Sequence, residues 1–84
     1  MSDQIKEINV RYYALLREER GCPSETIKTN AQTPLELYTQ LRQQYRFSLD
    51  INSLKVALND AFYSWDSPLQ DKDTVVFIPP VAGG

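Results

Sequence analysis

The residue types that most often carry out chemistry are almost absent from this chain of 84 residues. It contains no histidine, the side chain that most often acts as a general base or a metal ligand. Its single cysteine, Cys22, excludes an internal disulfide and a metal site built on paired cysteines. There is no glycine-rich phosphate loop, and the carboxylates are scattered without a pair that stands out. The side chains therefore supply little from which an active site could be built.

Cys22 is the one candidate nucleophile, and it precedes Pro23 in the turn-like segment RGCPSE. A thiol becomes reactive where cations lower its pKa, and only Arg17 and Arg20 lie near it in sequence. We therefore favour an unreactive surface or half-buried cysteine over a reactive one.

The last ten residues, VVFIPPVAGG, hold the other unusual feature, because two of the three glycines in the chain are its final residues. Glycine has no Cβ, so a backbone that ends in it can approach another molecule closely. A glycine pair at a terminus is a weak signal by itself, since frayed tails also end in glycine. Its meaning depends on the domain that carries it.

The composition favours one packed domain, because hydrophobic residues make up 42% of the chain and are spread along it. The net charge of −2 and the lack of a long basic stripe argue against nucleic acid as the main partner. The opening segment MSDQIKEINV has neither the basic nor the apolar region of a signal peptide. No apolar run approaches the roughly 20 residues that a membrane span needs. We therefore expect a cytoplasmic protein.

Two strands are expected in the first third of the chain. Apolar and polar side chains alternate within residues 5–16, which predicts a strand with one buried face. Residues 17–24, REERGCPS, predict a turn-rich break, and residues 25–30, ETIKTN, predict a short second strand. The inward face of the first strand is expected to hold Ile8, Val10 and Tyr12, and the outward face Asn9, Arg11 and Tyr13.

Residues 33–47 give the clearest helix signal. Thr33 is the expected N-cap, Pro34 suits the first helical position, and Glu36 would complete a capping box. An apolar stripe at helical spacing predicts the face that packs against the core. The stripe consists of Leu37, Tyr38, Leu41 and Tyr45.

Three further strands are expected, at residues 54–58, 61–65 and 74–78. Pro79 and Pro80 have no N–H groups to donate, so the sheet should end before them. One amphipathic helix among five strands predicts an α+β fold, a mixed sheet of four to five strands with one main helix packed on one face. We expect a single domain over residues 1–80 and a tail over residues 81–84.

Three stretches of the sequence resemble the MoaD/ThiS family of ubiquitin-like sulfur carriers, and most closely its MoaD type, the small subunits of molybdopterin synthase. They are INVRYYALLRE, VALND and SPLQDKDTVVFIPPVAGG, and the last, residues 67–84, is the most specific. The resemblance implies a β-grasp fold with the first and last strands side by side in the centre. Lys72 stands where the family often has glycine, so this turn should be slightly strained if the φ angle of Lys72 is positive.

The resemblance also implies a function for the terminal glycines. Gly84 would be adenylated by an E1-like enzyme that uses ATP, and a sulfurtransferase would convert it to a thiocarboxylate. Val81, Ala82 and Gly83 would enter a channel in the large catalytic subunit of molybdopterin synthase. There the sulfur would pass to the cyclic pyranopterin precursor and form the molybdopterin dithiolene. The chain would then bind no cofactor or metal, act as no enzyme on its own, and join two small and two large subunits in a heterotetramer.

The expected sheet also predicts a partner surface, because one helix covers only one of its faces. Strand alternation sends a second set of apolar side chains to the uncovered face, and contiguous apolar patches usually mark a partner site. The inward set adds Val56, Leu58, Tyr63, Val75 and Phe77 to the first strand's residues. The predicted partner interface comprises Tyr13, Phe62, Val76 and Ile78.

Two other readings of the same fold and ending stay open. One is the sulfur carrier of the thiamine pathway, whose members are usually shorter and lack Pro-Pro-Val before the glycines. The other is a ubiquitin-like protein modifier or a plain interaction module. A modifier would carry no sulfur and would form isopeptides with lysines of its targets.

Overall fold

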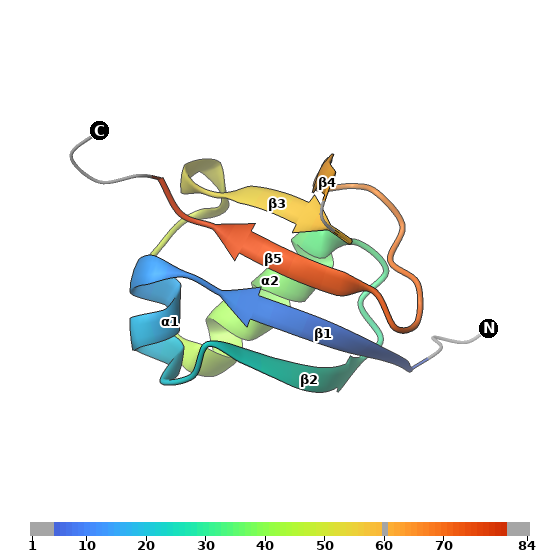
Figure 1. Cartoon of the computed structure of the whole chain (residues 1–84), viewed down its shortest axis with the longest axis horizontal. Coiled ribbons are helices and arrows are strands. Elements are labelled where there is room, and N and C mark those ends of the chain that lie inside the picture. The colour runs from blue at the N-terminus through green and yellow to red at the C-terminus, as the bar shows by residue number, and fades with distance from the viewer. Residues whose placement is uncertain (1–4, 60, 81–84) are drawn as a thin grey trace.

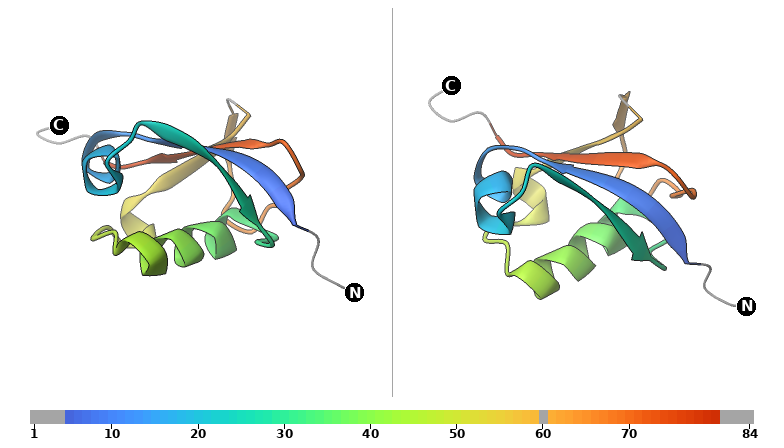
Figure 2. Two further views of the ribbon diagram at one scale, coloured as in Figure 1. Left: turned by 90° about the horizontal axis from the view of Figure 1, so that it is seen from below. Right: turned by 60° about the horizontal axis from the view of Figure 1, so that its bottom comes forward.

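The computed structural model describes residues 5–59 and 61–80, which form one mixed sheet with a long helix on one face (Figure 1). Figure 2 shows α2 beneath the sheet and α1 at the end where β1 finishes. The elements are β1 (Lys6–Tyr12), α1 (Ala14–Arg20), β2 (Ser24–Thr29), α2 (Pro34–Tyr45), the 3₁₀ helix η1 (Ile51–Ser53), β3 (Lys55–Leu58), β4 (Ala61–Tyr63) and β5 (Thr74–Ile78).

The strand order is β2-β1-β5-β3-β4, so the first and last strands lie together in the middle of the sheet. They are parallel, whereas the three other neighbouring pairs are antiparallel. This arrangement confirms the expected α+β class and the β-grasp topology. Its consequence is that β5, the strand that leads to the C-terminus, has a hydrogen-bonded neighbour on each side.

Alternate residues of the strands build the core between the sheet and α2, because successive side chains point to opposite faces. The inward face was predicted correctly for β1, β3 and β5, where no expected core residue exceeds 6% exposure. The confirmed residues are Ile8, Val10, Tyr12, Val56, Leu58, Val75 and Phe77.

The prediction for Tyr63 was wrong, since this side chain is 49% exposed. Tyr63 pairs with Val56 and so shares the inward side of the sheet. β4 is a three-residue edge strand, however, and all its residues are exposed. Figure 2 shows this strand rising away from the layer that α2 covers. At this edge of the sheet, a side chain that points inward is therefore still exposed to solvent.

Helix α1 corrects two expectations: the strand expected over residues 5–16 ends at Tyr12, and the turn expected over residues 17–24 is confined to residues 21–23, because residues 14–20 are helical. Its segment ALLREER consists of good helix formers, and Leu16 is fully buried beneath it. Gly21 ends the helix with a φ of 86°, and its N–H donates to the carbonyl of Arg17 at 2.9 Å. A buried leucine and a glycine cap thus stabilise a helix too short to form alone.

Helix α2 begins as predicted. The Thr33 hydroxyl accepts a hydrogen bond from the N–H of Glu36 at 3.2 Å. The Glu36 carboxylate accepts from the N–H of Gln32 at 3.0 Å, one residue before the cap, so the capping box is displaced by one position. Leu37, Tyr38 and Leu41 are buried, and Tyr45 packs on the core at partial exposure. None of the helices in the described ranges is long and apolar enough to span a membrane.

Candidate functional site

The candidate site is the point where the C-terminal tail leaves the sheet. β5 ends at Ile78, directly before Pro79 and Pro80, as the prolines predicted. Residues 81–84 lie outside the described residues, so the predictions for Val81, Ala82, Gly83 and Gly84 stay predictions. The structure defines the surface from which these residues depart.

β5, the strand that leads to the tail, packs into the core through two of its side chains. Val75 and Phe77 are both fully buried. The Phe77 ring stacks on Trp65 with a centroid separation of 5.9 Å and meets Tyr38 at 5.1 Å. Aromatic pairs at such distances add to the free energy gained from burial. The base of the tail therefore has a defined position and direction relative to the sheet.

The strand end from which the tail departs lies in the sheet, between β1 and β3, and the sheet face opposite α2 is the surface next to it. Pairing across the strands aligns Arg11, Val76, Ala57 and Phe62 in one transverse row, and Ile78 lies beside Lys55 in the next. Three of the four predicted interface residues present surface: Phe62 is 74% exposed, Tyr13 45%, and Ile78 is half-buried. Val76 is only 8% exposed, because it lies in a central strand with neighbours on both sides.

A polar network that sequence reasoning missed ties α1 to the first two strands. The Tyr12 hydroxyl donates to Oε2 of Glu25 at 2.6 Å. Arg20 donates to both carboxylate oxygens of Glu25, at 2.7 and 2.8 Å, and its guanidinium lies 4.0 Å from the centre of the Tyr45 ring. The sequence signal was ALLREERG, which places Arg20 in the last turn of a helix with a glycine cap.

This network is structural rather than reactive. The hydrogen bonds from Arg20 hold the pKa of Glu25 below its ordinary value, although partial burial opposes them. Burial, and then the hydrogen bond to Glu25, raise the pKa of Tyr12 above its ordinary value. The carboxylate therefore stays ionised and the phenol stays protonated at neutral pH, so neither group is poised to exchange a proton.

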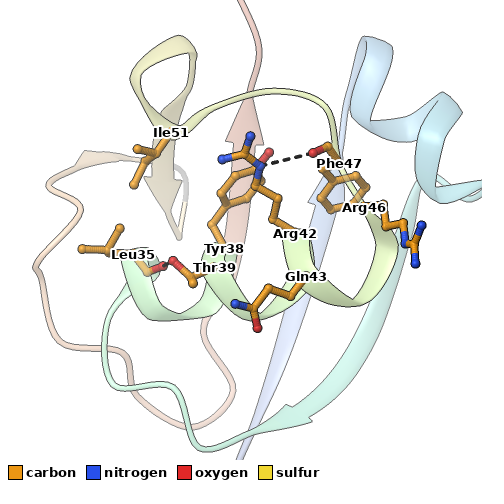
Figure 3. A pocket seen from close by; sticks show the side chains of 8 residues that line it. All are labelled: Leu35, Tyr38, Thr39, Arg42, Gln43, Arg46, Phe47 and Ile51. Atoms are coloured by element: carbon orange, nitrogen blue, oxygen red, sulfur yellow. Dashed lines mark hydrogen bonds between the residues drawn. The ribbon is translucent and has the colours of Figure 1, made fainter.

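A groove of about 470 Å³ runs along α2, on the helix side of the molecule (Figure 3). Arg42 crosses it, donating to the carbonyl of Phe47 at 3.2 Å and pairing with Asp50 at 3.4 Å. Burial raises the pKa of Tyr38 to about 12. No described residue that lines the groove is a carboxylate or a thiol, so it offers no acid–base pair or nucleophile. The lining comprises Leu35, Tyr38, Thr39, Arg42, Gln43, Arg46, Phe47 and Ile51.

Cys22 is a free, half-buried thiol that packs against the core, as expected, and its low reactivity stays a prediction. Within residues 5–59 and 61–80, no group of three or more histidine, cysteine or acidic side chains is arranged to hold a metal ion.

Comparison with known proteins gives a consistent result. The model of the ThiS family matches residues 10–84. The molybdopterin synthase sulfur carrier subunit of Escherichia coli (strain K12) is 32% identical over 80 residues, which cover 92% of this chain and 99% of that protein. A chain of the complex of subunits 1 and 2 of the molybdopterin-converting factor from Helicobacter pylori 26695 is similar in structure. Its TM-score is 0.64 at 26% identity, with 93% of this chain and 99% of that chain covered.

A further solved structure shares the fold at lower sequence similarity. The small archaeal modifier protein 1 of Methanosarcina acetivorans has a TM-score of 0.76 at 21% identity, over 96% of this chain and 99% of that one. At this identity the likeness concerns the β-grasp architecture alone.

Proposed function

This chain belongs to the ThiS family, and from that premise we propose that it is the sulfur carrier subunit of a molybdopterin synthase. The observation that carries the proposal is the end-to-end match to the Escherichia coli subunit of that name. The terminal Gly-Gly supports it, because a carrier of this kind holds its cargo on the main chain and needs no reactive side chain. On this proposal the chain works in the cytoplasm and has no catalytic activity of its own.

The proposed chemistry takes place at the carboxylate of Gly84. A terminal carboxyl group has an ordinary pKa of about 3.3–3.7, so it is an anion at neutral pH. In the activating enzyme one of its oxygens attacks the α-phosphate of ATP, and pyrophosphate leaves. A sulfur nucleophile supplied by a sulfurtransferase then displaces AMP from the acyl-adenylate. Where that nucleophile is a persulfide, a second thiol reduces the acyl disulfide that forms, becoming a disulfide with the sulfur donor, and Gly84 ends in a thiocarboxylate.

The thiocarboxylate would then act in the large subunit of molybdopterin synthase, where its sulfur attacks the cyclic pyranopterin precursor. Two such transfers complete the dithiolene. The Helicobacter pylori complex of subunits 1 and 2 supports a large-subunit partner for this chain. We propose two small and two large subunits in the assembly, and ATP as a substrate of the activating enzyme rather than as a cofactor bound here.

The geometry around β5 suits this role. The four residues after Pro80 reach roughly 13 Å when extended, enough to enter a narrow channel. Pro79 and Pro80 restrict the backbone where it leaves the strand. The buried anchor at Phe77 fixes the starting point, so a partner that docks on the outer face of the sheet would receive the tail in one direction.

Intact mass spectrometry tests the proposal. The chain is purified beside its activating enzyme, a sulfurtransferase and ATP, and we expect a gain of about 16 Da, one oxygen replaced by sulfur. A variant that lacks Gly84 should show no gain and no conversion of the pterin precursor, while its thermal melt stays unchanged. Normal pterin conversion by this variant would overturn the proposal.

The same preparation separates the two alternative functions. A thiamine-pathway carrier would gain the same mass but would not convert the pterin precursor. A protein modifier would instead appear as isopeptides between Gly84 and lysines of other proteins.

A further inference from the structure

The end of the outer sheet face from which the tail departs carries three exposed cations. Arg11 lies in β1, Arg17 in α1 and Lys55 in β3. Among the residues that the structure describes, none of the three has an ion-pair partner. Their charges are therefore available to another molecule.

The parallel pairing of β1 with β5 places these cations around the base of the tail. Arg11 lies opposite Val76 on one side of β5, and Lys55 lies opposite Ile78 on the other. Arg11 and Arg17 also line one hollow of about 220 Å³, several times the roughly 30 Å³ that a water molecule occupies. Its remaining described lining is Tyr12, Tyr13, Pro23 and Ser24, without a carboxylate.

Three other cations of the chain do have ion-pair partners. Arg20 is held by Glu25 at 2.7 Å, Arg42 by Asp50 at 3.4 Å, and Lys72 by Glu7 at 3.1 Å. Acidic side chains outnumber basic ones, eleven to nine. Arg11, Arg17 and Lys55 can therefore attract anionic groups of whatever receives the tail, although the protein as a whole is net negative.

We infer that the partner which receives the tail presents an acidic protein segment to this end of the sheet. One carboxylate would occupy the hollow between Arg11 and Arg17, where guanidinium groups can form paired hydrogen bonds to both oxygens. A second would face Lys55. The inference rests on the proposed function and adds the chemistry of the partner surface to it.

Protein carboxylates fit this surface better than the phosphates of a nucleic acid. The cations flank an apolar centre, with Val76 and Ile78 between them and the 74% exposed ring of Phe62 in the same row as Arg11. An apolar centre with a charged rim is the usual composition of a protein–protein interface. The net negative charge of the whole chain would repel a polyanion.

Charges at the rim of an interface mainly accelerate association and set its salt dependence. The test therefore measures the association rate constant of the full chain with the large subunit of molybdopterin synthase from the same genome. Stopped-flow mixing is carried out at ionic strengths of about 0.01 M and about 1 M, where the Debye length is roughly 30 Å and 3 Å. The variants are Arg11→Glu, Arg17→Glu and their combination, and Lys28→Glu is the control matched in charge change to each single substitution.

Lys28 is a suitable control because it is exposed, lies on the same face of the sheet in β2, and stands near the opposite end. We expect the double variant to associate at least about tenfold more slowly at low salt, with a weaker salt dependence, as is usual when steering charges are lost. Lys28→Glu should change the rate far less than either single substitution. Thermal melts confirm that each variant is folded.

Equal rates for the double variant and the unchanged chain would overturn the inference. So would salt-independent association of the unchanged chain, or an absence of binding to the large subunit. Binding of a short DNA duplex that Arg11→Glu with Arg17→Glu abolishes would also overturn it, in favour of phosphate recognition. If the mass gain at Gly84 is still observed in these cases, the sulfur-carrier proposal stands while the inference fails.

Discussion

Tyr12 has one of the bulkiest fully buried side chains, and yet its ring ends in a hydroxyl group. The burial is tolerated because this hydroxyl donates to Glu25, whose other hydrogen bonds come from Arg20. A buried polar group without such a partner would destabilise the fold by roughly 1–3 kcal/mol. No buried polar side-chain atom in the described part of the chain lacks a partner. The carboxylate of Glu25 in β2 therefore joins Tyr12 of β1 to Arg20 of α1.

The first prediction concerns the pH dependence of this network. The pKa of Glu25 is lower in the folded chain than its ordinary value, so the ionised carboxylate stabilises the fold above the unfolded pKa. That contribution is lost as the pH falls through the lower, folded pKa. We expect Glu25→Gln to reduce the free energy of unfolding by roughly 1–3 kcal/mol at neutral pH. The difference from the unchanged chain should shrink once the pH falls below about 4.

Urea unfolding at a series of pH values measures this difference. Glu18→Gln is the matched control, since Glu18 is exposed in the same region and no hydrogen bond or ion pair of its side chain is observed. A difference for Glu25→Gln that stays constant into strong acid would show that the carboxylate charge is not the stabilising feature.

At the scale of elements, several turns depend on residues in the left-handed backbone conformation, among them Gly21 and Lys72. Gly21 ends α1 at a φ of 86° before β2, and Lys72 turns the chain at a φ of 75° before β5. Glycine adopts this conformation without steric cost, whereas a residue with a Cβ is strained there. The φ of Lys72 is positive, so the slight strain that was expected in that case is present at this turn. Its N–H is held by the carbonyl of Glu7 at 2.7 Å, which keeps the turn in place.

The second prediction compares two substitutions of Lys72. Both Lys72→Gly and Lys72→Ala remove the ion pair to Glu7, which joins exposed side chains and contributes at most about 1 kcal/mol. Only glycine also removes the strain. We expect Lys72→Gly to be about 0.5–1 kcal/mol more stable than Lys72→Ala, after the greater unfolded-state entropy of glycine is included. Chemical denaturation of the two variants measures the difference.

The third prediction is the reverse change at the end of α1. A Cβ added at Gly21 would meet nothing within 4 Å, so only the backbone conformation opposes it. Gly21→Ala should therefore lower the free energy of unfolding by about 1 kcal/mol. A neutral effect in the thermal melt would mean that α1 has shifted to a different end.

At the scale of the whole molecule, the two faces of the sheet differ: one is covered by α2, and we propose that the other receives a partner. α2 covers the face that holds Val56 and Phe77. The other face presents Phe62 on the edge strand β4, Tyr13 after β1, and Ile78 at the end of β5. Exposed apolar side chains on an uncovered sheet face are the feature from which we predict a protein–protein interaction site.

The fourth prediction separates these two faces. We expect Phe62→Ala and Ile78→Asp each to weaken binding to the large subunit by roughly 1–3 kcal/mol in calorimetric titration. Stability should change little for Phe62→Ala, because its side chain is 74% exposed. Leu58→Ala, in the core, should instead reduce the free energy of unfolding by roughly 2–5 kcal/mol.

Leu35→Ala serves as the control for this experiment. Leu35 is a comparably exposed apolar residue at 42%, but it lines the groove on the helix side, away from the tail. Its substitution should leave binding unchanged. Equal losses of affinity for Leu35→Ala and Phe62→Ala would show that the partner does not prefer the outer face of the sheet.

Features that depend on neighbours in the chain could be read from the sequence alone. Residue alternation determined which side chains share a face in β1, β3 and β5, because successive Cβ atoms in a strand point to opposite sides. The start of α2 followed from Thr33 and Pro34, which act within one helical turn. The PPVAGG ending indicated the family by resemblance, and the tail chemistry at Gly84 stays a prediction that the described residues do not test.

Features that depend on distant segments were decided by the tertiary structure. α1 is stable because Leu16 is buried in the core; the helix formers of ALLREER favour a helix, but seven residues are too few to form one without such packing. Tyr63 faces inward and is still exposed, since the edge of the sheet extends beyond α2. Arg11 and Lys55 flank the same strand only because β5 pairs with β1 on one side and β3 on the other. The physical reason is that alternation orders side chains within one strand, whereas long-range pairing decides which strands are neighbours and which face is covered.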